Sequence, residues 1–257
     1  MYSHPRSLFG HTVIVTGASR GVGLGIAKAL AERGAQLLVT DIDGPALTAT
    51  VKTLETVAPA VVSVEADLSD PGAANVIVDA AVVRYGTLTG LVNNAIWIKN
   101  PTPFLGQDDD DFRQTFDTGP RATFQLMKAA YPHLKAAGGG SIVNLGSGAG
   151  TAGEEGFAVY AGAKEAIRGI TRVAALEWGK DNIRVNVIAP FANSEGIQAW
   201  ETVDPAAYRR AVDGNPMGRV GDVKTDIGAA AAWLLGDDST YLTAQTLMVA
   251  GGAGVTR

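Results

Sequence analysis

The sequence contains no cysteine, and this absence excludes several kinds of chemistry. Without cysteine the protein cannot form disulfides, use a thiolate nucleophile or hold zinc through cysteine ligands. Histidine is scarce as well, since His4, His11 and His133 are the only three and are scattered along the chain. We therefore expect no metal site, and we assign none of these histidines to catalysis.

Long apolar runs and blocks of positive charge are also missing. The longest apolar stretch, IGAAAAWLLG, is about half the length of a membrane span. The first residues lack the charged and apolar regions of a signal peptide. Lysine and arginine number 21 against 26 acidic residues, for a net charge of -5, and nothing resembles a nucleic-acid-binding patch. The expected protein is cytoplasmic and acts on a small molecule, without a nucleic acid or membrane partner.

The 257 residues that are present, 46% of them hydrophobic, suit one large globular domain spanning 1–257. Short β-branched runs alternate with segments of helical period. Strands are predicted at 12–16, 36–40, 60–66, 88–93, 140–146, 183–189 and 245–251. Right-handed crossovers place helices over both faces of a parallel sheet. The sequence thus predicts an α/β protein with a doubly wound, Rossmann-like, seven-stranded parallel sheet.

Two long connections interrupt this alternation, at 96–111 and 190–216. Each follows the carboxyl end of a predicted strand, and ligands of doubly wound proteins bind outside those ends. Both loops are therefore candidate walls of a substrate pocket. The acidic run at 108–111 is expected to begin a helix, because negative charge favours the helix dipole there.

A glycine-rich turn, TGASRGVG, joins the first predicted strand to a helix. Gly17 would allow the turn, Gly21 would let backbone amides approach a pyrophosphate, and Gly23 would let the helix pack closely. Asp41 lies 20 residues beyond Gly21 at the end of the second strand, where a carboxylate can bind ribose hydroxyls and repel a 2'-phosphate. Arg20 would instead attract that phosphate. We favour NAD(H), with NADP(H) as the alternative.

Tyr160 and Lys164 are four residues apart, so they share one face of a helix. A free phenol ionises near pH 10, and an ammonium group about 4 Å away at an effective dielectric of about 20 contributes roughly 4 kcal/mol toward its ionisation. This pair can supply a proton donor and acceptor near neutral pH. Ser147, which follows the fifth strand, could bind the same substrate oxygen.

In TGASRGVG, NNA, Ser147 and YAGAK, the chain resembles the short-chain dehydrogenase/reductase family over nearly its whole length. The resemblance implies hydride transfer between a nicotinamide and a carbinol or carbonyl carbon. It implies that Tyr160 is the general acid/base, that Ser147 positions the oxygen, and that Lys164 lowers the pKa of the tyrosine. It also implies a homotetramer or a homodimer.

The expected cofactor-binding residues lie in the glycine-rich turn, at the ends of strands, or at positions that match motifs of this family. They are Gly17, Ser19, Arg20, Gly21, Val22, Gly23, Asp41, Asp67, Leu68, Asn93, Ala95, Tyr160, Lys164 and Pro190.

Three positions depart from the family pattern. Gly119 stands where an asparagine usually completes a proton relay, Ile96 replaces the last glycine of NNAG, and Phe191 follows Pro190 in place of glycine. Loss of the asparagine predicts a slower enzyme, or one in which water compensates.

The two loops and the serine segment carry mainly apolar candidates for substrate contact, which suits a hydrophobic ketone or secondary alcohol. They are Trp97, Glu154, Phe157, Phe191 and Trp200, with Ile96, Phe104 and Gly148 beside them. The leading hypothesis is an NAD(H)-dependent oxidoreductase that interconverts such an alcohol and its ketone. The alternatives are an NADP(H)-dependent 3-oxoacyl-thioester reductase and a non-catalytic dinucleotide-binding protein.

Overall fold

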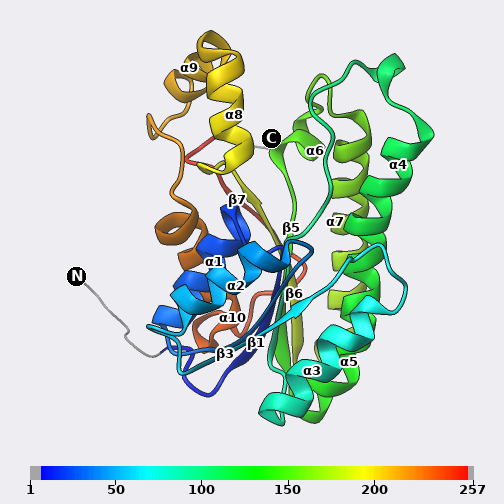
Figure 1. Ribbon diagram of the computed structural model, residues 1–257, viewed down its shortest axis with the longest axis vertical. Coiled ribbons are helices and arrows are strands. Elements are labelled where there is room, and N and C mark those ends of the chain that lie inside the picture. Colours follow the sequence, from blue (N-terminus) through cyan, green and yellow to red (C-terminus); the bar gives the residue numbers. More distant parts are fainter. Residues whose placement is uncertain (1–6, 254–257) are drawn as a thin grey trace.

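The computed structural model describes residues 7–253 and has one seven-stranded parallel sheet at its centre (Figure 1). The strands are β1 (Thr12–Thr16), β2 (Gln36–Asp41), β3 (Ala60–Glu65), β4 (Gly90–Asn93), β5 (Gly140–Leu145), β6 (Ile183–Pro190) and β7 (Thr246–Val249). Their spatial order is β3-β2-β1-β4-β5-β6-β7. All seven predicted strands are confirmed, and each boundary falls within two residues of its prediction.

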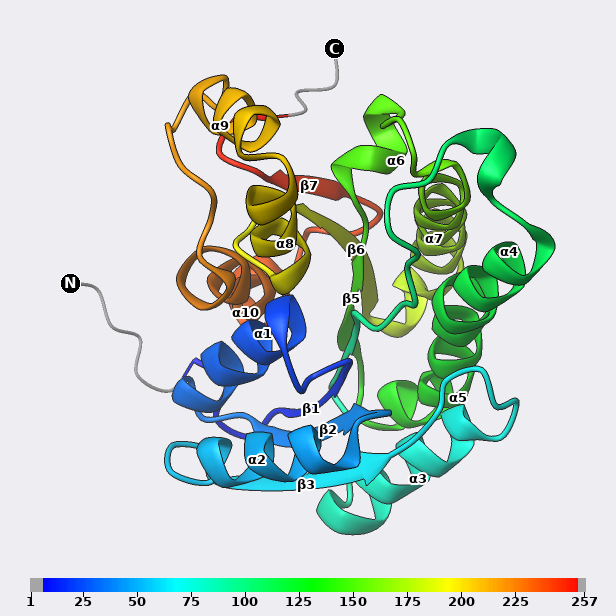
Figure 2. The same ribbon diagram turned by 45° about the horizontal axis from the view of Figure 1, so that its top comes forward.

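Helices cover both faces of the sheet, as the doubly wound prediction requires. They are α1 (Gly21–Glu32), α2 (Gly44–Leu54), α3 (Ala73–Tyr85), α4 (Asp109–Phe116), α5 (Ala122–Ala136), α6 (Gly148–Ala152), α7 (Ala158–Trp178), α8 (Glu195–Val203), α9 (Pro205–Asp213) and α10 (Ala229–Leu235). Figure 2 shows α1, α2 and α10 on one face and α3, α5 and α7 on the other. Among the described residues, no helix has the length and apolar character needed to cross a membrane.

Burial explains why the central strands read as continuous apolar runs. Every residue of β1 and β4 is buried, because helices pack on both faces of these strands. The edge strand β3 is only partly buried and exposes Ser63 and Glu65. One apolar core lies between the sheet and α1, α2 and α10, and a second lies under α3, α5 and α7.

The acidic run does begin a helix, as predicted. Asp108 caps α4 by accepting a hydrogen bond from the backbone of Asp111, whose side chain accepts one in return from the backbone of Asp108. Asp111 is buried and also accepts a 2.6 Å hydrogen bond from Lys99. The run therefore attaches the 96–111 loop to the start of α4.

The strand order reverses between β1 and β4, so the chain leaves these two neighbours toward opposite faces. Such a reversal opens a crevice at the carboxyl ends of the strands, where doubly wound proteins bind nucleotides. In Figure 1, α8 and α9 stand beyond these ends on one side, and α4 and α6 on the other. The two long predicted loops are the segments that carry α8, α9 and the start of α4.

Candidate active site

The glycine-rich turn packs too tightly to admit side chains. Gly17 adopts a φ of +63°, in the left-handed region that favours glycine. A Cβ atom added to Gly23 would lie 2.0 Å from the carbonyl oxygen of Gly17. The first turn of α1 therefore packs directly on the preceding turn, and any larger residue at position 23 would force the two apart.

The N-terminus of α1 is open to an anion. Arg20 occupies the N-cap position without a capping hydrogen bond from its side chain, and the first turn contains no acidic residue. Backbone N–H groups at such an end have no partner within the helix and can bind phosphate oxygens. The Ser19 hydroxyl beside them is buried and has no hydrogen-bond partner within residues 7–253. These groups fit the diphosphate of a dinucleotide.

Asn94 holds this turn in place, although the sequence predicted no separate role for it. The side-chain amide of Asn94 donates to the carbonyl oxygens of Thr16, at 2.9 Å, and Gly17, at 3.0 Å. The hydroxyl of Thr16 accepts from the backbone N–H groups of Asn94 and Ala95. Asn94 thereby joins the ends of β1 and β4. In the sequence, only its position in the NNA motif pointed to such a role.

Asp41 lies beside the same turn, as predicted for a ribose-binding residue. Its carboxylate accepts 3.0 Å and 3.3 Å hydrogen bonds from the backbone N–H groups of Ser19 and Asp43. Arg20 extends elsewhere: its guanidinium lies 3.6 Å from the Glu195 carboxylate, and its side chain is 72% exposed. The negative charge thus borders the turn, while the positive charge faces α8.

Three other predicted cofactor residues lie at strand ends. Leu68 is buried, whereas Asp67 is exposed and accepts a hydrogen bond from the backbone of Ser69. Asn93 is buried and donates a 2.8 Å hydrogen bond to the side chain of Asn144 on β5. The side-chain oxygen of Asn93 has no partner in the described part of the chain.

Ser147, Tyr160 and Lys164 come together where β5 ends and α7 begins. Ser147 is the N-cap of α6, and Tyr160 and Lys164 lie in the first two turns of α7, which packs against α6. The Ser147 hydroxyl accepts a 3.2 Å hydrogen bond from the backbone N–H of Ala149 and lies close enough to the Tyr160 phenol to influence its pKa. Lys164 is only 3% exposed, and its ammonium donates a 2.7 Å hydrogen bond to the carbonyl oxygen of Leu145.

Burial dominates the electrostatics of this cluster. It raises the pKa of Tyr160, the neighbouring Ser147 hydroxyl opposes that shift, and the charge of Glu154 adds to it. Burial also lowers the pKa of Lys164 to about 7. The Lys164 ammonium lies 5.5 Å from the centre of the Tyr160 ring. The Ser147 hydroxyl thus acts to lower the tyrosine pKa, although burial dominates and the net shift is upward.

The predicted substrate residues divide into two groups. The Phe157 ring lies 6.0 Å from the Tyr160 ring, and Glu154 is close enough to influence that phenol. Trp200, in contrast, packs edge-to-face on Tyr208 at 5.8 Å, which joins α8 to α9.

Backbone hydrogen bonds hold two further predicted substrate residues, Trp97 and Phe191. The N–H of Trp97 donates to the hydroxyl of Thr118, and the Phe191 backbone is bonded to Val249 and Gly221. Phe104 lies farther out, with 77% of its surface exposed. The structure thus brings Glu154 and Phe157 to the catalytic tyrosine candidate, and it anchors Trp97 and Phe191 through their backbones.

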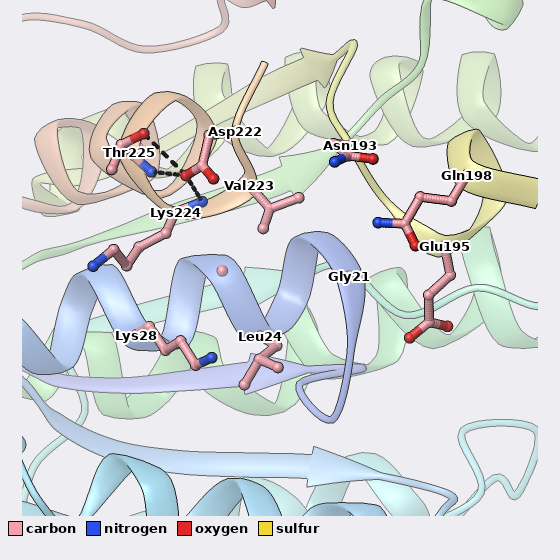
Figure 3. Close-up of a pocket in the computed structure, with 11 residues that line it drawn as sticks. Gly21, Leu24, Lys28, Asn193, Glu195, Gln198, Asp222, Val223, Lys224 and Thr225 are labelled. Atoms are coloured by element: carbon pink, nitrogen blue, oxygen red, sulfur yellow. Dashed lines mark hydrogen bonds between the residues drawn. The ribbon is translucent and has the colours of Figure 1, made fainter. Parts of the chain in front are cut away.

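A cavity of about 610 Å³ lies next to the glycine turn (Figure 3). It is lined by Gly21, Leu24, Gly25 and Lys28 of α1, by Asn193, Glu195 and Gln198, and by Asp222, Val223, Lys224 and Thr225. Asp222 accepts hydrogen bonds from Lys224 and Thr225 and so shapes one wall. None of Ser147, Tyr160 and Lys164 lines it, so the candidate catalytic groups lie elsewhere.

Within residues 7–253, no three histidine, aspartate or glutamate side chains gather as metal ligands would. His11 lies 3.4 Å from the Thr89 hydroxyl, and burial lowers its pKa. His4 falls outside the described residues.

The fold, the reversal of strand order and the open glycine turn define a dinucleotide-binding α/β protein. Comparison with known families gives the particular group. A family model described as enoyl-(acyl carrier protein) reductase matches residues 17–254. The chain belongs to the short-chain dehydrogenase/reductase family, whose enzymes oxidise CH–OH groups with NAD or NADP as the acceptor.

Several members are similar along almost their full length. The chain is 37% identical to a 12alpha-hydroxysteroid dehydrogenase of Clostridium sp., over 95% of this chain and 97% of the relative. It is 34% identical to a galactitol 2-dehydrogenase of Agrobacterium fabrum, over 93% and 95%. A crystal structure of carveol dehydrogenase from Mycobacterium avium in complex with NAD matches with a TM-score of 0.90 at 26% identity, covering 98% of this chain and all of that one.

Proposed function

We propose that this oxidoreductase uses NAD(H) to interconvert a hydrophobic secondary alcohol and its ketone. The observation that carries the proposal is the convergence of Ser147 and Tyr160 at the carboxyl end of β5, with the buried Lys164 one helical turn from Tyr160. Two hydroxyls that meet in this way can both bind a single substrate oxygen. The same edge of the sheet carries the glycine turn and Asp41.

Each of these side chains has a defined task. When bound, the nicotinamide ring would accept or supply the hydride. Tyr160 would give its phenolic proton to the carbonyl oxygen during reduction and remove the hydroxyl proton during oxidation. Ser147 would donate a hydrogen bond to that oxygen and hold it beside the phenol. Lys164, fixed on Leu145, would place its ammonium beneath the tyrosine and bind the cofactor ribose.

The proposal of NAD(H) rests on two charges. Asp41 is held against the glycine turn, where its carboxylate would repel a 2'-phosphate. Arg20, the residue that would attract this phosphate, faces Glu195. The structural neighbour in complex with NAD supports the same choice.

A hydrophobic substrate is supported by the side chains near Tyr160. Phe157 contacts the tyrosine, and Met248 approaches Gly148, the first residue of α6. A pocket lined mainly by apolar groups favours an apolar carbon skeleton. The names of two relatives, a hydroxysteroid dehydrogenase and a carveol dehydrogenase, agree with this class, whereas galactitol is polar.

We also propose that the protein is a homotetramer or a homodimer. Helices α4, α5 and α7 expose the apolar side chains of Phe112, Phe124, Val173 and Leu176. A patch of this kind is typical of a subunit interface. Light scattering after gel filtration would test the proposal, and a monomeric mass at micromolar concentration would contradict it.

Two measurements test the enzymatic proposal. Quenching of protein fluorescence by NADH and NADPH gives the dissociation constant of each cofactor, and NADH should bind more tightly. Absorbance at 340 nm then follows a panel of ketones and secondary alcohols, with Tyr160→Phe as the control. Preference for NADPH and for 3-oxoacyl thioesters would favour the thioester reductase. Tight cofactor binding without turnover of any substrate would favour a non-catalytic binder.

A further inference from the structure

Gln107 links two loops to the helix that carries Tyr160. Its side-chain N–H group donates to the carbonyl oxygens of Thr102, at 2.8 Å, and Gly156, at 3.1 Å. Its side-chain oxygen accepts a 3.0 Å hydrogen bond from the backbone N–H of Val159, which directly precedes Tyr160. Both polar atoms of this one amide are therefore bonded, each to a different part of the candidate site.

Helix α7 lacks a side-chain cap of its own, so the hydrogen bond from the Val159 N–H to Gln107 matters for its first turn. Its N-cap residue, Phe157, makes no capping hydrogen bond with its side chain. The N–H groups in the first turn of a helix have no partner within the helix. Gln107 satisfies one of them from a position 52 residues earlier in the chain. The first turn of the helix is thus fixed by a residue of the 96–111 loop.

The two loops also bond to each other beneath Gln107. The backbone N–H of Thr102 donates to the carbonyl oxygen of Gly156 at 3.0 Å, so that this oxygen accepts two hydrogen bonds. Gly156 has a φ of +83°, and a Cβ atom there would lie 3.1 Å from Pro101. Gln107 is half-buried, whereas Asp108 and Gly106 on either side of it are exposed.

We propose that Gln107 is a positioning residue for the reaction of Tyr160. Its side-chain oxygen fixes the first turn of α7, and with it the phenol that exchanges the proton. Its side-chain nitrogen holds the 96–111 loop against the 154–157 loop, which closes one wall of the substrate pocket. Displacing reacting groups by about 1 Å can lower a rate about 100-fold, so a small shift of this turn would be detectable.

The oxygen of Gln107, which caps α7, and its nitrogen, which holds the loops together, predict different kinetic effects. Two substitutions separate them. Gln107→Glu keeps an oxygen that can accept from Val159, where a negative charge favours the helix dipole, but it loses the donor to the loops. Gln107→Met has a similar length and loses both functions. We expect Gln107→Glu to retain kcat within about twofold and to raise KM, and Gln107→Met to lower kcat about tenfold or more.

The control is Gln125→Met on α5, another half-buried glutamine whose side chain makes no hydrogen bond within residues 7–253. It should leave kcat and KM unchanged. The dissociation constant of NADH should stay the same in all three variants, because Gln107 contacts no part of the glycine turn. Equal losses of kcat in Gln107→Glu and Gln107→Met would overturn the role of the oxygen, and an unchanged KM in Gln107→Glu would overturn that of the nitrogen.

The kinetic test rests on the proposed function, since it needs a substrate from the alcohol and ketone panel. Hydrogen exchange measured by mass spectrometry on peptides spanning 155–162 needs none. Gln107→Met should exchange faster there than the native protein and Gln107→Glu, with no change in peptides of α5. Unchanged exchange in Gln107→Met would overturn the capping role even if the protein turned over no substrate, whereas absent turnover by the native protein would count only against the proposed function.

Discussion

Ile96 occupies the space that a side chain at position 119 would need. A Cβ atom on Gly119 would stand 2.6 Å from the Cδ1 atom of Ile96, closer than carbon atoms approach without a shift in the structure. Gly119 is buried in the π-helical turn Asp117–Arg121, which packs against α7. Two departures from the family pattern, an isoleucine for glycine and a glycine for asparagine, are therefore one complementary pair.

This pairing predicts strong coupling between the two positions. Gly119→Asn alone should lower the free energy of unfolding by about 1–3 kcal/mol, because the new side chain overpacks against Ile96. Ile96→Gly should also destabilise, by about 1–3 kcal/mol, because it removes a half-buried apolar side chain and adds backbone freedom to the unfolded chain. The double variant should be more stable than the sum of these effects predicts, by about 1 kcal/mol or more. Urea denaturation measures all three, and additive effects would contradict the pairing.

The double variant Ile96→Gly/Gly119→Asn also tests whether the missing asparagine weakens the proton relay. Gly119→Asn restores the relay asparagine expected from the resemblance, but the new side chain must displace the end of the Ile96 side chain. The nearby polar groups are occupied, since Asp117 pairs with Arg121 and the Thr118 hydroxyl donates to the carbonyl oxygen of Gln114. We expect Ile96→Gly/Gly119→Asn to turn over faster than Ile96→Gly and to show a different pH profile. Identical kcat values and pH profiles would refute the view that the missing asparagine slows the enzyme.

Lys164 should make the stability of the protein depend on pH. Its pKa is about 7 in the folded protein, against 10.5 for an unperturbed lysine, so between these values the unfolded chain binds a proton that the folded protein lacks. Stability therefore rises with pH across this window, by up to about 1.4 kcal/mol per pH unit from this group. Lys164→Met should remove that slope and abolish turnover. Urea denaturation at pH 7, 8 and 9 tests it: a constant difference between native protein and variant would contradict the burial of a neutral amine.

Glu154 should shift the pH dependence of alcohol oxidation. Its negative charge helps to raise the pKa of Tyr160, and oxidation requires the deprotonated phenol as the base. Glu154→Gln removes the charge, so the rise of kcat/KM with pH should move to lower pH. Ser147→Ala should move it to higher pH and lower kcat about 100-fold, because a hydroxyl that favours the ionised phenol and binds the substrate oxygen is lost. Shifts in the same direction for both variants would contradict this assignment.

Asp41 should control the choice between the two cofactors. Asp41→Asn keeps an oxygen that can accept from the Ser19 backbone but removes the negative charge. The ratio of the NADPH to the NADH dissociation constant should then fall about tenfold, equivalent to about 1.4 kcal/mol. Arg20→Ala should change the ratio little, because that exposed side chain faces Glu195. A larger effect from Arg20→Ala than from Asp41→Asn would favour an NADP(H) enzyme.

Much of the architecture was predictable because it depends on local pattern. Strands such as Thr12–Thr16 and Gly140–Leu145 are buried on both faces, and apolar, mostly β-branched residues form their centres, VIV and IV. The acidic run at 108–111 is a local signal too, since a capping box needs only residues three apart. For the same reason Tyr160 and Lys164 were expected on one face of a helix.

Other features depend on contacts between distant segments, which carry no local signal. Gln107 reaches a helix 52 residues away, and Asn94 bonds to residues 77 and 78 positions earlier. The electrostatics of the Tyr160 cluster belong to this group as well. The four-residue spacing predicted that Lys164 lies beside Tyr160. Only the folded structure shows that burial lowers the pKa of this lysine to about 7 and that its amine bonds to the carbonyl oxygen of Leu145.

The sequence by itself determined the seven strands, the glycine turn and the residue types that meet at the carboxyl edge of the sheet, because period and spacing act over a few residues. Only the tertiary structure decided how deeply Lys164 is buried, where Arg20 points, and that Ile96 fills the space beside Gly119. Those outcomes depend on desolvation and on close packing between segments far apart in the chain, and both exist only once the chain has folded.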